Sequence, residues 1–428
     1  MKKSLIILVV VIFIAGISYF TRGDNELSFI SVDEQPMADE TGATQEGVAG
    51  IVDANNKFAF NLYFQYTEKY QNKNIFFSPY SISSALAMVY EGAEGTTAEE
   101  IEKVFYFPKE DEDRRASFAK IFNDINKEEK TYKLSTANAL WAQKDFTFLD
   151  DYKFNVTNYY GGEVINLDFV GETEKSRVTI NDWVESKTNN KIKDLIPQGV
   201  LSEMTRSVLT NAVYFKGNWA QPFDKKDTKD EDFEVNKDTV VKVPTMQLMG
   251  DDAKFNYTEN DEVQFLELPY EGGNLSMLVI LPKGSDLSRI EKSIDSKKIA
   301  EWKTASHKVR VDVYLPKFKF ETKDFMKDTL EKMGMSNSFN SELADFSGMT
   351  GKKDLFIGQV IHQAFVEVNE EGTEAAAATA VSLQITSVLV DIPDEVLIFR
   401  ADHPFIFLIQ QNQTGNVLFM GRVNNPAK

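Results

Sequence analysis

One stretch near the C-terminal end of the sequence restricts the possible folds more than any other feature. Residues 373–386 read TEAAAATAVSLQIT. Every second residue from Thr373 to Ile385 is small or apolar, and the residues between them are small or polar. This alternation is typical of a β-strand with one buried face. The first half is rich in alanine, however, and no bulky side chain precedes Val381. Because flexible Gly372 lies just before it, the stretch could occupy two different positions.

Two interpretations of this stretch are possible. Because alanine is the best helix former, residues 373–381 could form a short exposed helix with Thr373 near its N-cap. Residues 369–379, NEEGTEAAAAT, also resemble the hinge of the inhibitory serpins, a family of serine protease inhibitors. In that family the segment is the base of an exposed reactive loop, which after cleavage inserts as a new central strand into a large sheet. The resemblance implies a reactive loop at about 370–395 and these hinge residues: Gly372, Thr373, Glu374, Ala375, Ala376, Ala377 and Ala378.

Further motifs resemble serpin sequences and occur in the same order. Residues 74–86, NIFFSPYSISSAL, predict a short apolar strand and then a helix with Pro79 in its first turn. Residues 208–219, VLTNAVYFKGNW, predict a strand too apolar to face water, in which the amide of Asn211 stands alone among apolar residues and needs buried partners. The other motifs are helices at 181–192 and 324–333, a β-hairpin at 266–281, the segment 314–318 and strands at 399–409 and 417–423.

The resemblance extends over about residues 51–428. It implies an α+β fold, namely a single large serpin domain with three β-sheets, about eight to nine helices and an exposed reactive loop. We expect residues 375–395 to be exposed and poorly ordered before cleavage, and Val396–Phe399 to pair again as a strand. The alternation also predicts that Thr373 turns inward only when the loop inserts, so its side chain should be outside the sheet beforehand.

The resemblance also assigns two polar clusters to the main sheet. The shutter, where the sheet parts, comprises Ser78, Ser81, Asn211 and His362. Judged from the sequence alone, His362 is a core histidine that bonds to a neighbour. As part of a buried network that is costly to half-break, it would instead make sheet opening a two-state event.

The second cluster, the breach, lies where insertion begins and comprises Trp219, Lys317 and Glu370. In the family the residues corresponding to Lys317 and Glu370 form a salt bridge. At a surface such a pair contributes only about 0–1 kcal/mol. Even that amount would matter at a strand end that must not open early.

The chain lacks the residue patterns of common enzymes. It has three histidines and no cysteine, and no zinc-protease HExxH, no GxSxG and no phosphate-binding P-loop occur in it. We therefore expect no catalytic activity, no metal and no cofactor. A formal net charge of −19 argues against nucleic acid as a partner. A hydrolase or structural protein on another fold is the competing hypothesis, and the missing catalytic residues argue against it.

The spacing from hinge to cleaved bond, which inhibitory serpins share, places the reactive bond at Thr386–Ser387. This suits an elastase-like or subtilisin-like serine protease, with a cysteine protease as another possible target, and we expect the inhibitor to be a monomer. The segment from Ser387 to His403 is longer than in many serpins, so cleavage after Ile385, Val388 or Leu389 remains open. Trypsin fits worst, because no Lys or Arg occurs between residues 353 and 400.

A non-inhibitory serpin, acting as a chaperone or carrier, is the alternative function. A charged or bulky residue in place of Thr373, or a proline within 373–380, would favour that reading. Neither is present.

The N-terminal residues point to export. In residues 1–22, Lys2 and Lys3 precede an apolar run at 4–20, which predicts a signal peptide or an N-terminal membrane anchor. Either would place the body of the protein outside the cell, secreted or anchored to the outer face of the membrane. Residues 23–50 are acidic and contain one aromatic residue, so we expect a disordered acidic linker before the serpin domain at 51–428.

Overall fold

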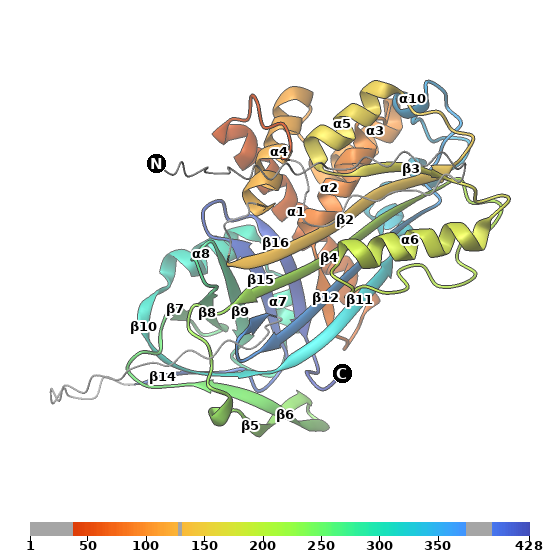
Figure 1. Ribbon diagram of the computed structural model, residues 1–428. Helices are drawn as coiled ribbons and strands as arrows, with labels where there is room; N and C mark the ends of the chain where they lie inside the picture. Colours follow the sequence, from red (N-terminus) through yellow and green to blue (C-terminus); the bar gives the residue numbers. More distant parts are fainter. Residues whose placement is uncertain (1–36, 127–130, 374–395) are drawn as a thin grey trace, which may run out of the picture. The chain divides into compact units, whose positions relative to one another are not determined.

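The structure is a computed structural model, which describes residues 37–126, 131–373 and 396–428 (Figure 1). All of these residues belong to one compact unit, Ser31–Lys428. Among them, no helix has the length and apolar character needed to cross a membrane. The predicted signal or anchor segment at residues 4–20 lies outside the described residues.

Ten α-helices are present in the described part of the chain. They are α1 (Gln45–Lys69), α2 (Pro79–Tyr90), α3 (Gly95–Phe105), α4 (Asp111–Asn126), α5 (Asp150–Tyr160), α6 (Thr173–Lys187), α7 (Ser288–Glu291), α8 (Ser296–Ala305), α9 (Lys327–Met333) and α10 (Ser347–Thr350). The count exceeds the expected eight to nine because α7 and α10 are single turns of four residues each.

Within the residues that the structure describes, the strands form two hydrogen-bonded sheets. The six-stranded sheet has the order β11-β12-β13-β4-β2-β3 and contains β2 (Tyr132–Gln143), β3 (Glu163–Leu167), β4 (Ser207–Asn218), β11 (Phe318–Phe325), β12 (Gln359–Asn369) and β13 (Gly372–Thr373). The ten-stranded sheet contains β1 (Ile75–Phe77), β5 (Lys229–Asn236), β6 (Thr239–Leu248), β7 (Lys254–Glu259), β8 (Val263–Pro269), β9 (Leu275–Pro282), β10 (His307–Pro316), β14 (Leu397–Arg400), β15 (Phe405–Gln411) and β16 (Val417–Val423).

Strand β10 explains why three sheets were expected and two are counted. Its residues 307–310 pair with β7, whereas residues 311–316 pair with β14 and β6. The ten-stranded sheet is therefore two parts that share β10, and with the six-stranded sheet these make three. The predicted hairpin is β8 and β9, which pair antiparallel. The prediction that the chain pairs again after the loop is also confirmed, because β14 pairs with β10.

The two faces of the six-stranded sheet are covered differently. Helix α2, capped by Ser78 with Pro79 in its first turn, is almost entirely buried and contacts β2, β4 and β16, so it lies between the two sheets. Helix α6 crosses the other face (Figure 1). Its Trp183 packs edge-on against Trp141 of β2, and the same apolar cluster reaches Ile361 of β12. This cluster therefore spans the boundary between β4 and β12.

The predicted linker at residues 23–50 needs correction for the part that the structure describes. Helix α1 begins at Gln45, and the Thr44 side chain caps it by accepting a hydrogen bond from Gly47 N. Residues 37–44 lie along α4 and α5, where Ala38 is buried. The acidic composition suggested disorder because it lacks apolar bulk, but a cap and buried side-chain hydrogen bonds order these residues instead.

Candidate functional site

The hinge begins inside the six-stranded sheet. Strands β4 and β12 are parallel neighbours from Val208 and Gln359 up to Tyr214 and Phe365. Beyond that point they separate, and the two residues of β13 lie between them, pairing antiparallel with both strands. The sheet thus has a seam between β4 and β12, which is closed along most of its length and already holds the start of a new strand at one end.

Thr373 is therefore buried in the uncleaved chain, contrary to the expectation that it lies outside the sheet before insertion. It is 1% exposed, and its Oγ1 lies 2.7 Å from the hydroxyl of Tyr270. Its inward orientation agrees with the predicted alternation. The physical reason for the early entry is that a free hydroxyl partner and two open strand edges are available at this end of the seam.

Gly372 is required where the chain turns into the sheet. Its φ of +153° is rarely adopted by residues with a side chain, and a Cβ atom built on it would lie 2.0 Å from the carbonyl oxygen of Gly217. Strand β4 approaches the hinge too closely for any other residue. The sequence suggested that Gly372 provides flexibility. In this structure glycine is needed instead because the backbone of β4 lies so close to it.

The breach residues lie together beside the hinge. Lys317 Nζ lies 3.0 and 2.8 Å from the two carboxylate oxygens of Glu370, which is 3% exposed. Thr228 donates a further hydrogen bond of 2.8 Å to the same carboxylate. Burial opposes ionisation of Glu370, but the hydrogen bonds from Lys317 and Thr228 outweigh it and hold its pKa below the usual value.

Trp219 connects the breach to the hinge through main-chain atoms. Its indole Nε1 donates to Asn369 O at 3.0 Å, and its backbone N donates to Glu371 O at 2.9 Å. Its ring stacks on Tyr270, with centroids 4.7 Å apart. Tyr270 also contacts Thr373. The Trp219–Tyr270 pair therefore bonds to residues on both sides of Gly372 in the sequence.

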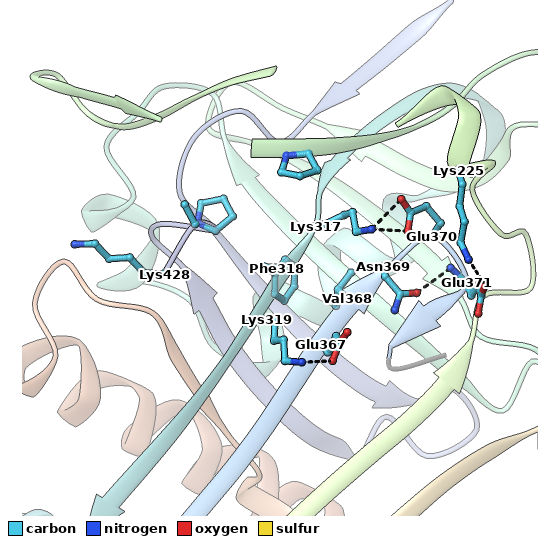
Figure 2. Close-up of a pocket in the computed structure, with 13 residues that line it drawn as sticks. Lys225, Lys317, Phe318, Lys319, Glu367, Val368, Asn369, Glu370, Glu371 and Lys428 are labelled. Atoms are coloured by element: carbon cyan, nitrogen blue, oxygen red, sulfur yellow. Dashed lines mark hydrogen bonds and ion pairs between the residues drawn. The ribbon is translucent and has the colours of Figure 1, made fainter. Parts of the chain in front are cut away.

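A cavity of about 470 Å³ opens beside these residues (Figure 2). Three lysine–glutamate pairs line it: Lys317–Glu370, Lys225–Glu371 and Lys319–Glu367. Lys317 and Lys319 flank the first residue of β11, and Lys225 lies in the segment after β4, so the pairs link the end of β12 and the turn after it to two other parts of the chain. The charges in these pairs balance. We infer that the pairs mainly attach the segment around Glu370 and Glu371 to the rest of the fold.

The shutter residues form one buried network across the closed part of the seam. His362 of β12 and Asn211 of β4 lie directly opposite each other, and their side chains are hydrogen-bonded. Asn211 Nδ2 lies 2.6 Å from Ser81 Oγ, and Ser78 Oγ donates to Leu418 O at 2.7 Å. The network joins both edges of the seam to α2 beneath it.

The hydrogen bonds determine the protonation state of His362. The amide nitrogen of Asn211 donates to Ser81, so its oxygen accepts, and His362 Nδ1 must carry the proton. His362 Nε2 is then free to accept from Ser78 N, 3.3 Å away. Burial lowers the pKa of His362 to about 4, so the ring is neutral at pH 7.

The comparisons with known proteins agree with this geometry. A family model described as Serpin (serine protease inhibitor) matches residues 53–426. The chain is a serpin. An uncharacterized serpin-like protein of Methanosarcina mazei is 43% identical over 379 residues, covering 88% of this chain and 87% of that protein. Leukocyte elastase inhibitor A of Rattus norvegicus is 42% identical, covering 87% of this chain and 98% of its own.

Solved serpin structures superpose closely on this one. The structure of human thyroxine-binding globulin gives a TM-score of 0.80 at 33% identity, covering 89% of this chain and 99% of that one. The serpin fold is therefore confirmed. Serpins are protease inhibitors rather than enzymes, although the family also includes members with other functions.

The sequence-based site assignments fall into two groups. The structure brings together the four shutter residues, the three breach residues, and Gly372 and Thr373 of the hinge. The other predicted hinge residues, Glu374 and Ala375–Ala378, and the predicted reactive bond Thr386–Ser387 lie outside the described residues. Their assignment remains a prediction.

Three residues of the site were not predicted from the sequence. Asn138 of β2 accepts a hydrogen bond from Asn211 and extends the shutter to a third strand. It has the same signal as Asn211, an isolated amide in an apolar strand, and could have been found by that rule. Tyr270 and Thr228 gave no signal, because their roles depend on which strands meet at the hinge.

Proposed function

We propose that this serpin inhibits an elastase-like or subtilisin-like serine protease as a suicide substrate. The protease cleaves the reactive loop at or near Thr386–Ser387 and forms an acyl-enzyme. Insertion of the loop between β4 and β12 then displaces the protease before water can release it. A cysteine protease, which also forms an acyl intermediate, would be trapped by the same insertion.

One observation carries the proposal. The structure places Thr373 as an inward-facing residue between two parallel strands, paired on both sides. The residues that follow alternate so that a continuing strand would place Ala375, Ala377 and Thr379 on the same inward face. Small side chains there would let the strand advance before the seam has opened fully.

A covalent complex tests the proposal. The full-length protein is incubated with a pancreatic elastase, a subtilisin, a trypsin and a papain-type protease, and the products are separated by denaturing gel electrophoresis. We expect an SDS-stable complex with elastase or subtilisin. The mass of the released C-terminal peptide should be that of a peptide that begins at Ser387. Rapid reversible inhibition without an adduct would refute the trapping mechanism.

A matched variant tests the assigned bond separately. Thr386→Arg should transfer trapping to trypsin, because trypsin requires Arg or Lys before the cleaved bond, while the hinge is unchanged. If wild type traps trypsin as well as elastase, or if Thr386→Arg does not change the target, the bond lies elsewhere. Cleavage after Ile385, Val388 or Leu389 would then appear in the mass of the released peptide.

A non-inhibitory role as a chaperone or carrier is the alternative. It is supported by the similarity to thyroxine-binding globulin, whose name describes a ligand-binding protein. Complete cleavage of the loop by every protease in the panel, without any covalent complex, would favour this alternative.

We also propose that the protein is exported. This rests on Lys2, Lys3 and the apolar run at residues 4–20. Fractionation of cells that express the full chain would test it: recovery in the cytoplasmic fraction would refute export, and recovery in the membrane or the medium would separate anchor from signal peptide.

A further inference from the structure

Residues 37–44, here called the strap, lie against helices α1, α4 and α5. The backbone of Ala38 is clamped by one buried side chain: Asn123 Oδ1 accepts from Ala38 N at 2.8 Å, and Asn123 Nδ2 donates to Ala38 O at 2.9 Å. Asn123 is 1% exposed. The strap lies before residue 53, where the match to the serpin family model begins. It therefore lies outside the part of the chain that the family model matches.

The strap contacts three helices in succession. Asp39 N donates to Asn158 O of α5 at 2.7 Å. Ala38 packs against Ala119 and Phe122 of α4. At its other end Thr44 donates to Asp113 of α4 at 3.1 Å and caps α1. A single continuous segment thus fastens α5, α4 and α1 to one another.

These helices belong to different sides of the seam. A strand that inserts fully between β4 and β12 must move β4, β2 and β3 away from β12 by about 4.8 Å. Helix α5 packs against β3 and would move with it, whereas α1 packs against β16 of the other sheet. Helix α4 contacts both α1 and α5. Opening the seam therefore displaces α5 relative to α1, and the strap spans that displacement.

We propose that the strap restrains the opening of the six-stranded sheet and so slows loop insertion. This inference rests on the proposed function, because it concerns the rate of the same insertion. The bonds of Asn123 and Asn158 to the strap hold the closed sheet and must break or shift as the helices separate. Release of the strap should lower the barrier to insertion without altering the seam itself.

The experiment measures how fast the uncleaved full-length protein takes up a synthetic peptide with the sequence of residues 373–386. Uptake is followed by native gel electrophoresis and by the rise in unfolding temperature. Ala38→Arg cannot fit between Ala119 and Phe122 and should release the strap while leaving every helix residue in place. Met37→Arg, at a neighbouring position that is 62% exposed, is the matched control.

We expect Ala38→Arg to take up the peptide about fivefold to thirtyfold faster than wild type, the factor that one or two lost hydrogen bonds would give. Met37→Arg should stay within about twofold of wild type by the same scale. Asn123→Ala, which removes the clamp from the helix side, should accelerate uptake as Ala38→Arg does. Faster limited proteolysis within residues 37–44 should accompany both changes.

The possible failures are distinguishable. If wild type traps no protease as a covalent complex, the proposed function fails, and this inference fails with it. If wild type traps protease but neither it nor Ala38→Arg takes up peptide, only the strap inference is refuted. If wild type takes up peptide and Ala38→Arg does so at the same rate or more slowly, only the strap inference is refuted. A strap that stays protected from proteolysis in Ala38→Arg would also refute it, because Ala38 would then not be the anchor.

Discussion

Replacing Thr373 with arginine tests whether the hinge must enter the sheet. In the uncleaved chain this side chain is 1% exposed and bonded to Tyr270. An arginine there would place an unpaired guanidinium among buried groups, at a cost of about 3–5 kcal/mol. The substitution therefore affects the native state as well as insertion.

The native state can avoid burying the guanidinium if β13 withdraws from the seam, which costs less free energy. Withdrawal loses the bond between Thr373 and Tyr270 and roughly two ladder hydrogen bonds, at about 1 kcal/mol each. Freeing two residues returns about 1–2 kcal/mol of backbone entropy for each residue. The net destabilisation should therefore be at most about 1 kcal/mol, which corresponds to at most a few degrees in unfolding temperature.

Insertion has no such alternative, because position 373 must enter before any later residue can. If the insertion barrier rises by about 3 kcal/mol or more, insertion slows by about a hundredfold, and hydrolysis of the acyl-enzyme should win. Thr373→Arg should therefore change the serpin from an inhibitor into a substrate. The assay is the ratio of cleaved to covalently trapped serpin with elastase.

Two controls separate charge from shape. Thr373→Val keeps the volume, loses only the hydroxyl bond to Tyr270 and should still trap the protease. Glu374→Arg changes the neighbouring residue, which the alternation predicts to face outward, and should be much milder than Thr373→Arg. Trapping by Thr373→Arg at the wild-type ratio would show that insertion does not pass through this position.

Three further results are expected. Burial lowers the pKa of His362 to about 4, below the unfolded value of about 6.5, so the free energy of unfolding should fall by roughly 3 kcal/mol as pH drops from about 6.5 to about 4. Denaturant unfolding across this range should show a weaker pH dependence of that free energy for His362→Gln. The same pH dependence in both proteins would contradict the assignment. Lys317→Met leaves the buried carboxylate of Glu370 without its cation and should lower the free energy of unfolding in urea by about 1–3 kcal/mol. The loss is smaller than for a fully buried pair because the Lys317 side chain is 36% exposed. No change would mean that the pair is only a surface contact. Gly372→Ala would clash with Gly217 O and should push the hinge out, which a changed tryptophan emission spectrum would report; an unchanged spectrum would argue against the close contact.

The sequence was informative where a pattern repeats or where a polar residue interrupts an apolar strand. Alternation predicted that Thr373 faces inward, and the lone amide at Asn211 predicted a buried network. What it could not predict is the state of the seam. Whether β13 enters depends on Tyr270, a residue far from the hinge in sequence that meets it only in the folded sheet. For the same reason the exposure of Glu370, and hence the strength of its pair with Lys317, could not be judged in advance.

The register of β13 predicts which loop residue reaches the shutter. Gly372 and Thr373 lie opposite Asn218 and Gly217 of β4 and opposite Asn369 and Val368 of β12. If insertion continues both registers, Thr379 arrives between Asn211 and His362, which lie opposite each other in the closed seam.

The approach of Thr379 would separate a pair of buried polar side chains, and a partner left unbonded costs about 1–3 kcal/mol. In such an inserted strand Thr379 would face the same inward side as Thr373, and its hydroxyl could both accept from His362 and donate to Asn211. Thr379→Val should therefore weaken the cleaved, inserted form by about that amount and leave the uncleaved form unchanged. Thr379→Ser, which keeps the hydroxyl, should resemble wild type. If denaturant unfolding shows the cleaved forms of both variants to be equally stable, the inserted strand does not follow the register that β13 begins.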